Sequence, residues 1–391
     1  MPDHEQQATA TIGILGWDGC EFLAADFERA RRFYAATMDV PEIARLEPRV
    51  AARRGEQAAL FRAGKAVFSV ASPTERGARA ARWLARRPDG AATIALRVRD
   101  AAAARAALER RGATLVAETA DERDLEGRPY RWFEIAAPLG EVRFRFVERA
   151  AGALPPGFAP REPGAAANRF GIQVVDHVAS SFLTIEPFVT WLRDVLGFAE
   201  YWRSRFHERD VDPRAGGAGL AAIVMWDPES GIKFAAEEPA APNFEAGRAY
   251  LFCAENRGPG VQHVAFHVPA IVPAVAGLRA AGARFLDAPA SYYELLPERL
   301  AAHNVPRLEE RIDDLRRLGI LADGEDERYL LQAFMVDGAG LFDDPQAGPF
   351  FHEIIQRRGA RGFGEGNFRA IFEALARDRR RRAERDEGEG R

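Results

Sequence analysis

The feature that most constrains the fold is a motif that occurs four times: a short apolar strand, a turn and an amphipathic helix. The four copies are residues 20–38, 93–111, 174–196 and 261–281. The helices of the second and fourth copies end at Gly112 and Gly282, each followed by alanine, where glycine suits a left-handed C-terminal cap. The repeat predicts a chain assembled from copies of one strand–helix unit.

The four copies fall into two pairs. Residues 151–164, between the pairs, are rich in proline, glycine and alanine, a composition typical of an interdomain linker. We therefore expect one domain at residues 10–150 and a second at residues 168–360, each long enough to bury a core. The charge-dense end of the chain, residues 378–391, is typical of a solvated helix end.

Composition excludes several classes of protein. The 54 basic and 58 acidic side chains nearly balance, whereas a protein that binds nucleic acid phosphates needs a net basic face. No segment approaches the roughly 20 consecutive apolar residues of a membrane span, and the first residues do not resemble a secretory signal. Two cysteines, Cys20 and Cys253, cannot form a disulfide framework. We expect a cytoplasmic protein that binds neither nucleic acid nor a membrane.

Two of the seven histidines occupy equivalent places in the third and fourth copies. His177 lies in Val-Asp-His-Val and His263 in Val-Gln-His-Val. A single histidine on an apolar strand is usually a hydrogen-bonded core residue, but two at the same place in a repeat predict imidazoles that point into a shared concavity. The corresponding places in the first two copies hold Gly19 and Thr93, which are not useful ligands. The chemistry is therefore expected in the second domain only.

A third ligand is expected in the strand-like run 350–357. There Glu353 shares a face with Phe351 and Ile355, and a buried carboxylate is costly unless it is paired or bound to a metal. An ion pair of Glu353 with Arg357, or with another side chain, is the alternative explanation. Two histidines and one carboxylate, with positions left open, are the ligand set of non-haem Fe(II) oxygenases.

Seven motifs follow one another through the second domain. They are Val-Asp-His-Val at 175–178, Gly-Pro-Gly-Val-Gln-His-Val-Ala at 258–265, Ser-Tyr-Tyr-Glu-Leu-Leu-Pro-Glu-Arg at 291–299, Leu-Gly-Ile-Leu at 318–321, Tyr-Leu-Leu-Gln at 329–332, Glu-Ile-Ile-Gln-Arg at 353–357 and Gly-Phe-Gly-Glu-Gly-Asn-Phe at 362–368. In these motifs the chain resembles the 4-hydroxyphenylpyruvate dioxygenase family, which includes hydroxymandelate synthase and belongs to the vicinal oxygen chelate superfamily. The N-terminal half resembles that family's degenerate, metal-free domain.

The resemblance implies an α+β fold of paired βαβββ modules, the glyoxalase-like fold. It implies two tandem domains, a metal-free N-terminal pair and a catalytic Fe(II) pair, and then a C-terminal gating helix at residues 363–385. The spacing of Phe368, Ile371, Phe372 and Leu375 favours this helix independently, because these residues share one helical face.

The resemblance also implies the chemistry. Fe(II) would be held by His177, His263 and Glu353, with no catalytic side chain beyond these ligands. A 2-oxo acid would chelate the iron through its carboxylate and keto oxygens, react with O2, lose its carboxyl group and be hydroxylated. Such a role belongs to aromatic amino acid metabolism, and we expect the protein to be a homo-oligomer, a dimer or a tetramer.

The expected substrate-binding residues are Gln262, Gln332, Phe334, Phe363, Phe368, Ala222, Glu237 and Arg248. Several places differ from the family, which has Asn at Glu237, Gln at Arg248, Ser at Ala222 and Thr at Met335. Because mismatched buried polar groups go unpaired, we expect 4-hydroxyphenylpyruvate to be a poor substrate compared with another 2-oxo acid. The alternative is that Glu237 and Arg248 pair with each other and leave the substrate unchanged.

Three other functions stay open on the sequence. They are hydroxymandelate-type benzylic hydroxylation, oxidation of a different 2-oxo acid, and binding of a small molecule without catalysis. A pure binding protein has no need of the three ligands, which speaks against the last. The glycine-rich run 362–366 lacks the Lys-Ser/Thr of a phosphate loop, so nucleotide binding is not expected.

Overall fold

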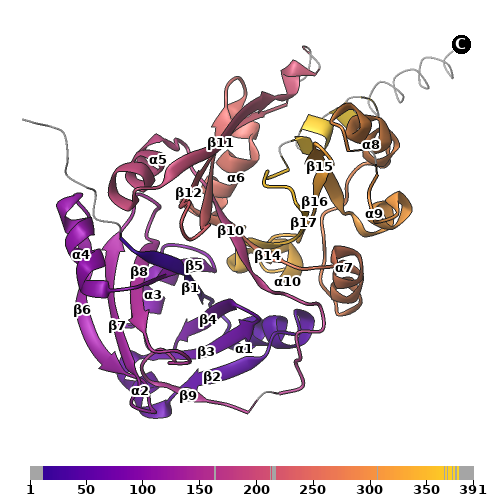
Figure 1. The fold of residues 1–391 in the computed structure, drawn as a ribbon. Coiled ribbons are helices and arrows are strands. Elements are labelled where there is room, and N and C mark those ends of the chain that lie inside the picture. Colours follow the sequence, from indigo (N-terminus) through magenta and orange to yellow (C-terminus); the bar gives the residue numbers. More distant parts are fainter. Residues whose placement is uncertain are drawn as a thin grey trace, which may run out of the picture.

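The computed structural model describes residues 12–162, 164–211, 213, 217–305, 307–364, 366, 367, 369–371, 373, 374 and 377. Within these residues the chain forms two curled mixed sheets, one from each half, with helices along their margins (Figure 1). No helix in the described part of the chain is both long enough and apolar enough to cross a membrane.

Sheet A, from the N-terminal half, has nine strands within the described residues, in the order β6-β7-β8-β5-β1-β4-β3-β2-β9. Its strands are β1 Ile14–Leu23, β2 Glu42–Leu46, β3 Glu56–Ala63, β4 Ala66–Pro73, β5 Gly90–Val98, β6 Leu115–Arg123, β7 Pro129–Ala136, β8 Arg143–Arg149 and β9 Phe158–Pro160. Its helices are α1 Phe27–Arg32 with its continuation η1 Phe33–Thr37, α2 Pro48–Arg54, α3 Arg79–Leu84 and α4 Ala101–Arg110.

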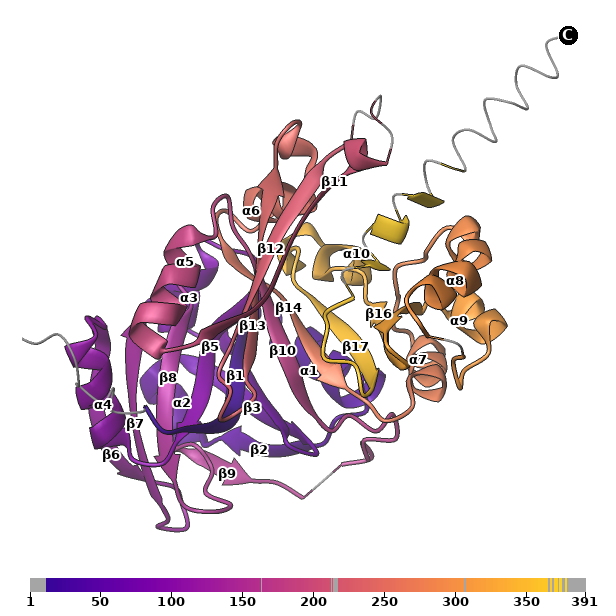
Figure 2. The same cartoon turned by 45° about the horizontal axis from the view of Figure 1, so that its top comes forward.

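Sheet B, from the C-terminal half, has eight strands in the described part of the chain, in the order β11-β12-β13-β10-β14-β17-β16-β15. Its strands are β10 Val174–Ser181, β11 Ala199–His207, β12 Gly219–Trp226, β13 Lys233–Ala240, β14 Gly260–His267, β15 Leu321–Glu325, β16 Arg328–Phe334 and β17 Phe351–Arg358. Its helices are α5 Glu186–Trp191 with η2 Leu192–Leu196, η3 Glu208–Asp210, η4 Phe244–Ala246, α6 Arg248–Glu255, α7 Ile271–Ala280, α8 Ala290–Ala302, α9 Ile312–Leu318, α10 Gly338–Phe342 and η5 Pro345–Ala347. Helices α7, α8 and α9 lie beside β15–β17 in both views (Figures 1 and 2).

Each of the four sequence repeats begins a βαβββ module, so the predicted α+β fold of paired modules is confirmed. The modules are β1-α1-β2-β3-β4, β5-α4-β6-β7-β8, β10-α5-β11-β12-β13 and β14-α7-β15-β16-β17, the last with α8 and α9 inserted. Gly112 and Gly282 follow the helices of the second and fourth modules at φ +83° and +96°, where other residues are strained.

The register of sheet B brings three predicted ligands to one face. Strands β10 and β14 lie antiparallel at its centre, and β17 runs parallel to β14. Ala265 on β14 pairs with His177 on one side and with Glu353 on the other, while His263 pairs with Ala179. Directly paired residues point to the same face of a sheet. The methyl group of Ala265 therefore stands between two larger polar side chains and leaves them room to converge.

The main hydrophobic core lies between the two sheets. The ring of Phe266 on β14 lies 5.8 Å from that of Phe68 on β4, and Phe234 on β13 lies 5.4 Å from Phe144 on β8. Strand β14 is buried at seven of its eight positions, because one face packs against sheet A and the other lines the site. A strand buried on both faces is expected to be almost wholly apolar. The polar side chains of Gln262 and His263 on this strand therefore need a specific reason.

The predicted linker contributes an edge strand to sheet A. Strand β9 pairs with β2, with Pro160 at the outer end of the ladder, where a missing N–H is tolerated. Sheet A thus extends to residue 160 and sheet B begins at Val174. The domain limits 10–150 and 168–360 stay predictions.

The predicted C-terminal helix is described only in part. Residues 366, 367, 369–371, 373, 374 and 377 are helical, whereas Phe363 and Gly364 are not. Gly364 has φ +75°, a value that cannot continue a right-handed helix. Phe368, Phe372, Leu375 and residues 378–385 lie outside the described residues.

A network of ion pairs in sheet A occupies the place that corresponds to the predicted ligands. Ala95 pairs with Gly19 and with Arg145, as Ala265 pairs with His177 and Glu353. The guanidinium group of Arg145 donates to Glu134 at 2.6 and 2.9 Å, and Arg143 donates to the same carboxylate at 3.1 Å. Where sheet B gathers metal-ligating groups, sheet A holds charges that satisfy one another.

We predict that Glu134→Gln lowers the free energy of unfolding by about 3 kcal/mol, because it leaves two arginines without their shared counter-ion at a position only 3% exposed. Glu141→Gln is the matched control, since Glu141 pairs with Arg86 at the surface and should lose less than about 1 kcal/mol. Urea unfolding of both variants measures the difference, and equal losses would contradict the prediction.

Candidate metal centre and substrate pocket

Three buried side chains converge on the concave face of sheet B. His177 extends from β10, His263 from β14 and Glu353 from β17, and their potential ligand atoms all lie within 4.8 Å of one another. The Nε2 atoms of the two histidines lie 3.3 and 3.1 Å from the same Oε2 of Glu353. The structure thus brings together the three residues that the sequence nominated as ligands.

Two atoms of this group lack hydrogen-bond partners. Among the described residues, neither Nε2 of His263 nor Oε2 of Glu353 forms a hydrogen bond, although both atoms are buried. Buried polar atoms are rarely left unsatisfied in proteins. A divalent cation at this place would use both atoms as ligands, and two imidazoles with one carboxylate suit iron with positions left open. The donor set therefore fits the metal that the fold implies.

The histidines are oriented by hydrogen bonds on the side away from the centre. Nδ1 of His177 donates to Asp176 at 2.9 Å, and Nδ1 of His263 donates to the side-chain oxygen of Gln262 at 3.0 Å. These bonds place the proton on Nδ1 and leave Nε2 of each ring free to face a metal. Arg357 completes the arrangement, because its guanidinium group holds Asp176 at 2.7 and 2.8 Å. Among the described ion pairs, Arg357 is joined to Asp176 and not to Glu353, contrary to the alternative drawn from the sequence.

The carboxylates of the centre stay ionised. Burial alone would raise the pKa of Glu353, but the two imidazoles, when they also carry a proton on Nε2, lower it to about 2. Burial would likewise raise the pKa of Asp176, but Arg357 holds it well below its usual range. Since Arg357 neutralises Asp176, the charge of Glu353 is left to attract a cation.

A pocket of about 690 Å³, including its open mouth, lies beside these three residues. The side chains that line it are His177, Ala179, Trp202, Ser204, Phe206, Leu220, Ala222, Val224, Ala235, Glu237, His263, Gln332, Phe334, Glu353 and Phe363. Five predicted substrate-binding residues are among them: Ala222, Glu237, Gln332, Phe334 and Phe363. Its size and largely apolar lining are those of a small-molecule site.

Sequence reasoning missed the wall formed by β11 and β12. Trp202, Ser204 and Phe206 alternate along β11, and Leu220 and Val224 flank Ala222 on β12 at the same spacing of two. The signal was present, because every second residue from Ala222 must share its face.

The other predicted substrate-binding residues lie elsewhere. Gln262 does not line the pocket but joins His263 to Ser181 and Glu237 through its side-chain amide. Arg248 is exposed at the first residue of α6, and among the described residues it forms no ion pair with Glu237, unlike the alternative left open by the sequence. Phe368 lies outside the described residues.

Met335 is also not part of the pocket. It follows Phe334 at the end of β16, so its side chain points to the opposite side of the sheet and borders a second cavity between the two halves. Its difference from the family therefore does not alter this pocket directly.

Glu237 is the acidic group of the pocket wall. Its side chain is 9% exposed, and its carboxylate accepts one hydrogen bond from Gln262, at 3.3 Å. Burial raises the pKa of Glu237, and the nearby His263 and Arg248 offset only part of that rise. An acid held in this way is available to meet a substrate.

Sequence and structure comparisons agree with this geometry. Residues 174–295 match the profile of the Glyoxalase/Bleomycin resistance protein/Dioxygenase superfamily. The chain is 30% identical over 389 residues to 4-hydroxyphenylpyruvate dioxygenase of Caenorhabditis elegans, covering 96% of this chain and 95% of the relative. It is 32% identical over 305 residues to the enzyme of the same name from Dictyostelium discoideum, covering 76% and 80%. A solved structure of a mutant 4-hydroxymandelate synthase from Streptomyces coelicolor matches with a TM-score of 0.75 and 26% identity, covering 94% of this chain and 99% of that one.

Fold and site together define a dioxygenase of the vicinal oxygen chelate class. Within that class, the extent of the match to its relatives is decisive: the chain belongs to the 4-hydroxyphenylpyruvate dioxygenase family. The resemblance drawn from the motifs is thereby confirmed.

The raised pKa of Glu237 leads to a prediction about stability and pH. The folded protein holds this proton more tightly than the unfolded chain, so wild-type stability falls as pH rises from about 4.3, the ordinary pKa of glutamate, to the raised value. We expect Glu237→Gln to gain stability relative to wild type over that window and to keep a constant advantage above it. Urea unfolding across the pH range measures the difference, with Glu229→Gln on the exposed β12–β13 turn as the baseline for loss of a carboxylate. A difference that does not change with pH would contradict the prediction.

Proposed function

We propose that this protein is an Fe(II)-dependent dioxygenase that decarboxylates and hydroxylates a 2-oxo acid, with the iron held by His177, His263 and Glu353. The observation that carries the proposal is the pair of buried atoms without hydrogen-bond partners, Nε2 of His263 and Oε2 of Glu353, 3.1 Å apart where three ligands converge. The names of the relatives support the reaction type. The cytoplasmic location and the homo-oligomer stay predictions.

Bound Fe(II) would supply the redox chemistry with O2 that protein side chains lack. The chain's own residues bind the tail of the substrate and keep water out. Trp202, Phe206 and Phe334 offer an apolar wall, and the ring of Phe363 lies 4.9 Å from that of His177. An enclosure of this kind protects a reactive centre from solvent.

The start of the C-terminal helix is tied to Glu353 through one amide. Gln332 donates from Nε2 to Glu353 at 2.9 Å and to the carbonyl oxygen of Phe363 at 3.1 Å, and its Oε1 accepts from Asn367 at 3.0 Å. A movement of this segment would therefore shift Gln332 and, through it, the carboxylate of Glu353. These contacts support a gating role for the helix.

We propose that the tail of the substrate ends in a hydrogen-bond donor or a positive charge. Ala222 pairs in register with Ser204 on β11 and with Glu237 on β13, so these three side chains form a row in the pocket. A buried carboxylate is stabilised when a bound group donates to it or neutralises it. The phenol of 4-hydroxyphenylpyruvate can donate a hydrogen bond but leaves the charge of Glu237 in place, so it suits such a row less well than a cationic group.

Benzylic hydroxylation of the hydroxymandelate type is the second candidate. The neighbour with a TM-score of 0.75 is a 4-hydroxymandelate synthase, and the match covers 99% of that chain. Oxygen uptake with Fe(II) and a panel of 2-oxo acids, followed by mass spectrometry of the products, distinguishes the two. Absence of oxygen uptake with every 2-oxo acid would refute both.

The metal ligands can be tested without turnover. We predict that His263→Ala weakens Fe²⁺ binding at least about 100-fold, because it removes one of three ligands. His267→Ala is the matched control on the same strand, since His267 is half-buried at the end of β14 and contacts Gln173. Anaerobic titration calorimetry gives both affinities. The proposal fails if the two variants bind Fe²⁺ equally well.

The pocket row predicts selectivity. Glu237→Asn combined with Ala222→Ser restores the family's residue types and should raise kcat/KM for 4-hydroxyphenylpyruvate about tenfold, equivalent to about 1.4 kcal/mol of transition-state stabilisation. Arg248→Gln should leave it unchanged, because Arg248 is exposed outside the pocket. Conversion of 4-hydroxyphenylpyruvate by the wild type at about 10⁴ M⁻¹s⁻¹ or above would instead show that Glu237 accommodates the phenol.

A further inference from the structure

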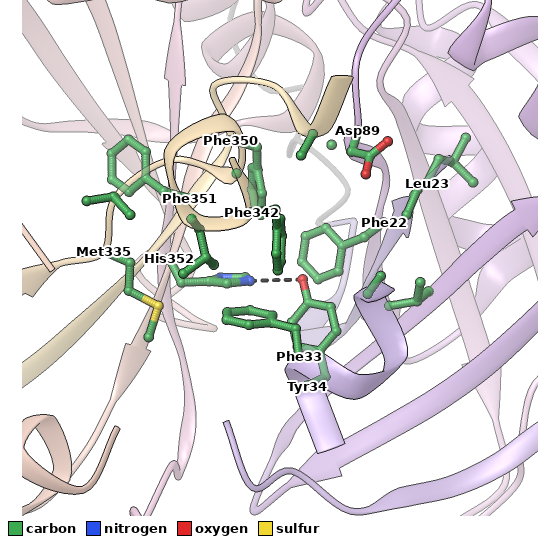
Figure 3. A pocket seen from close by; sticks show the side chains of 18 residues that line it. Phe22, Leu23, Phe33, Tyr34, Asp89, Met335, Phe342, Phe350, Phe351 and His352 are labelled. Carbon is green, nitrogen blue, oxygen red and sulfur yellow. Dashed lines mark hydrogen bonds between the residues drawn. The ribbon is translucent and has the colours of Figure 1, made fainter. Parts of the chain in front are cut away.

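A second cavity lies on the other side of the strand that carries Glu353, between the two halves of the chain (Figure 3). Phe22, Phe33 and Tyr34 border it from the N-terminal half, and Phe350 and His352 from the C-terminal half. In Figure 3 the imidazole of His352 points across the boundary at the hydroxyl group of Tyr34. Next to His352 on that face of β17 stand the apolar side chains of Phe350 and Ile354, and the polar Gln356 and Arg358 follow farther along the strand.

His352 forms two hydrogen bonds with defined directions. Its Nε2 lies 2.9 Å from the hydroxyl oxygen of Tyr34, and its Nδ1 lies 3.3 Å from the carbonyl oxygen of Val264. The rings of Phe22 and Phe33 pack against this imidazole, and in such an apolar setting it is neutral and carries one proton. The carbonyl can only accept, so Nδ1–H donates to Val264, and Nε2 accepts from the tyrosine O–H.

Two of the three residues linked by these hydrogen bonds, Val264 and His352, lie next to predicted metal ligands. Val264 and His352 are register partners on β14 and β17. Val264 directly follows His263, and His352 directly precedes Glu353. The side chain of His352 therefore links β17 to Val264 of β14 on one face of the sheet. On the other face, the next residues, Glu353 and His263, must meet.

Packing holds the plane of this ring but does not distinguish its nitrogen atoms from its carbon atoms. Five aromatic rings approach it at centroid distances of 5.0 to 6.3 Å, those of Phe22, Phe33, Tyr34, Phe266 and Phe350. A half-turn about the Cβ–Cγ bond would keep the ring in the same plane but would break both hydrogen bonds. The two hydrogen bonds therefore fix which way the ring faces.

We propose that the Tyr34–His352–Val264 hydrogen-bond chain is a positioning device through which the N-terminal half holds β14 and β17 at the spacing that lets His263 and Glu353 share a metal. The inference rests on the proposed metal site. It gives the N-terminal half a part in metal binding, although none of the residues described in that half lines the substrate pocket.

Binding of Co²⁺ alone, measured by titration calorimetry on the full chain, tests the device without turnover. Tyr34→Phe removes the hydroxyl that fixes the imidazole and should weaken Co²⁺ binding about tenfold, as loss of supporting hydrogen bonds does at other metal sites. Tyr293→Phe is the matched control, because Tyr293 is 3% exposed and its hydroxyl has no hydrogen-bond partner among the described residues. It should change the affinity less than twofold.

A second pair of variants separates positioning from general stability. In His352→Gln the amide can accept from Tyr34 and donate to Val264, so Co²⁺ affinity should stay within about threefold of wild type, whereas His352→Leu should lose tenfold or more. Equal Co²⁺ affinity of Tyr34→Phe and wild type would overturn the inference, as would equal losses in the two His352 variants. A wild-type protein that binds no Co²⁺ would overturn the proposed metal site and this inference with it.

Discussion

The carboxylate of Glu353, buried to 1% exposure at the centre of sheet B, is the group on which the rest of the site depends. A charge in such a place is tolerated only when its surroundings compensate for lost water. Two imidazoles approach one of its oxygens, and the amide of Gln332 binds the other. The partners of these groups continue outward through Asp176 and Gln262, so that the polar interior is a connected network within an apolar core.

The polar network occupies one face of sheet B, so the other face is left to pack against sheet A. The face of sheet B opposite the site is aromatic and meets sheet A, and the pocket is lined by strands of sheet B together with Phe363, which follows β17. The site is thus enclosed by one half and supported from behind by the other. A buried metal site needs such support, because the ligands must be held in place before the metal arrives.

The elements that sequence reasoning predicted well are those whose information is local. The four repeats, the glycine caps and the places of His177, His263 and Glu353 follow from periodicity and from motifs. The contacts that it missed depend on register. The sequence does not reveal that Ala222 faces Ser204, or that Arg248 is exposed at the start of α6 and forms no ion pair with Glu237 among the described residues. Pairing between distant strands decides such contacts, and no short stretch of chain encodes it.

The equivalence of Ala95 and Ala265 shows how one architecture can be either closed or reactive. Around Ala95 the side chains are mainly arginines and glutamates, which form hydrogen bonds with groups of the protein itself. Around Ala265 three side chains converge that would occupy only part of the coordination sphere of a divalent metal. The first arrangement is an ion-pair network that only holds strands together, whereas the second would leave coordination positions open toward a pocket. In this fold, reactivity depends on the buried polar atoms that the protein itself leaves without partners.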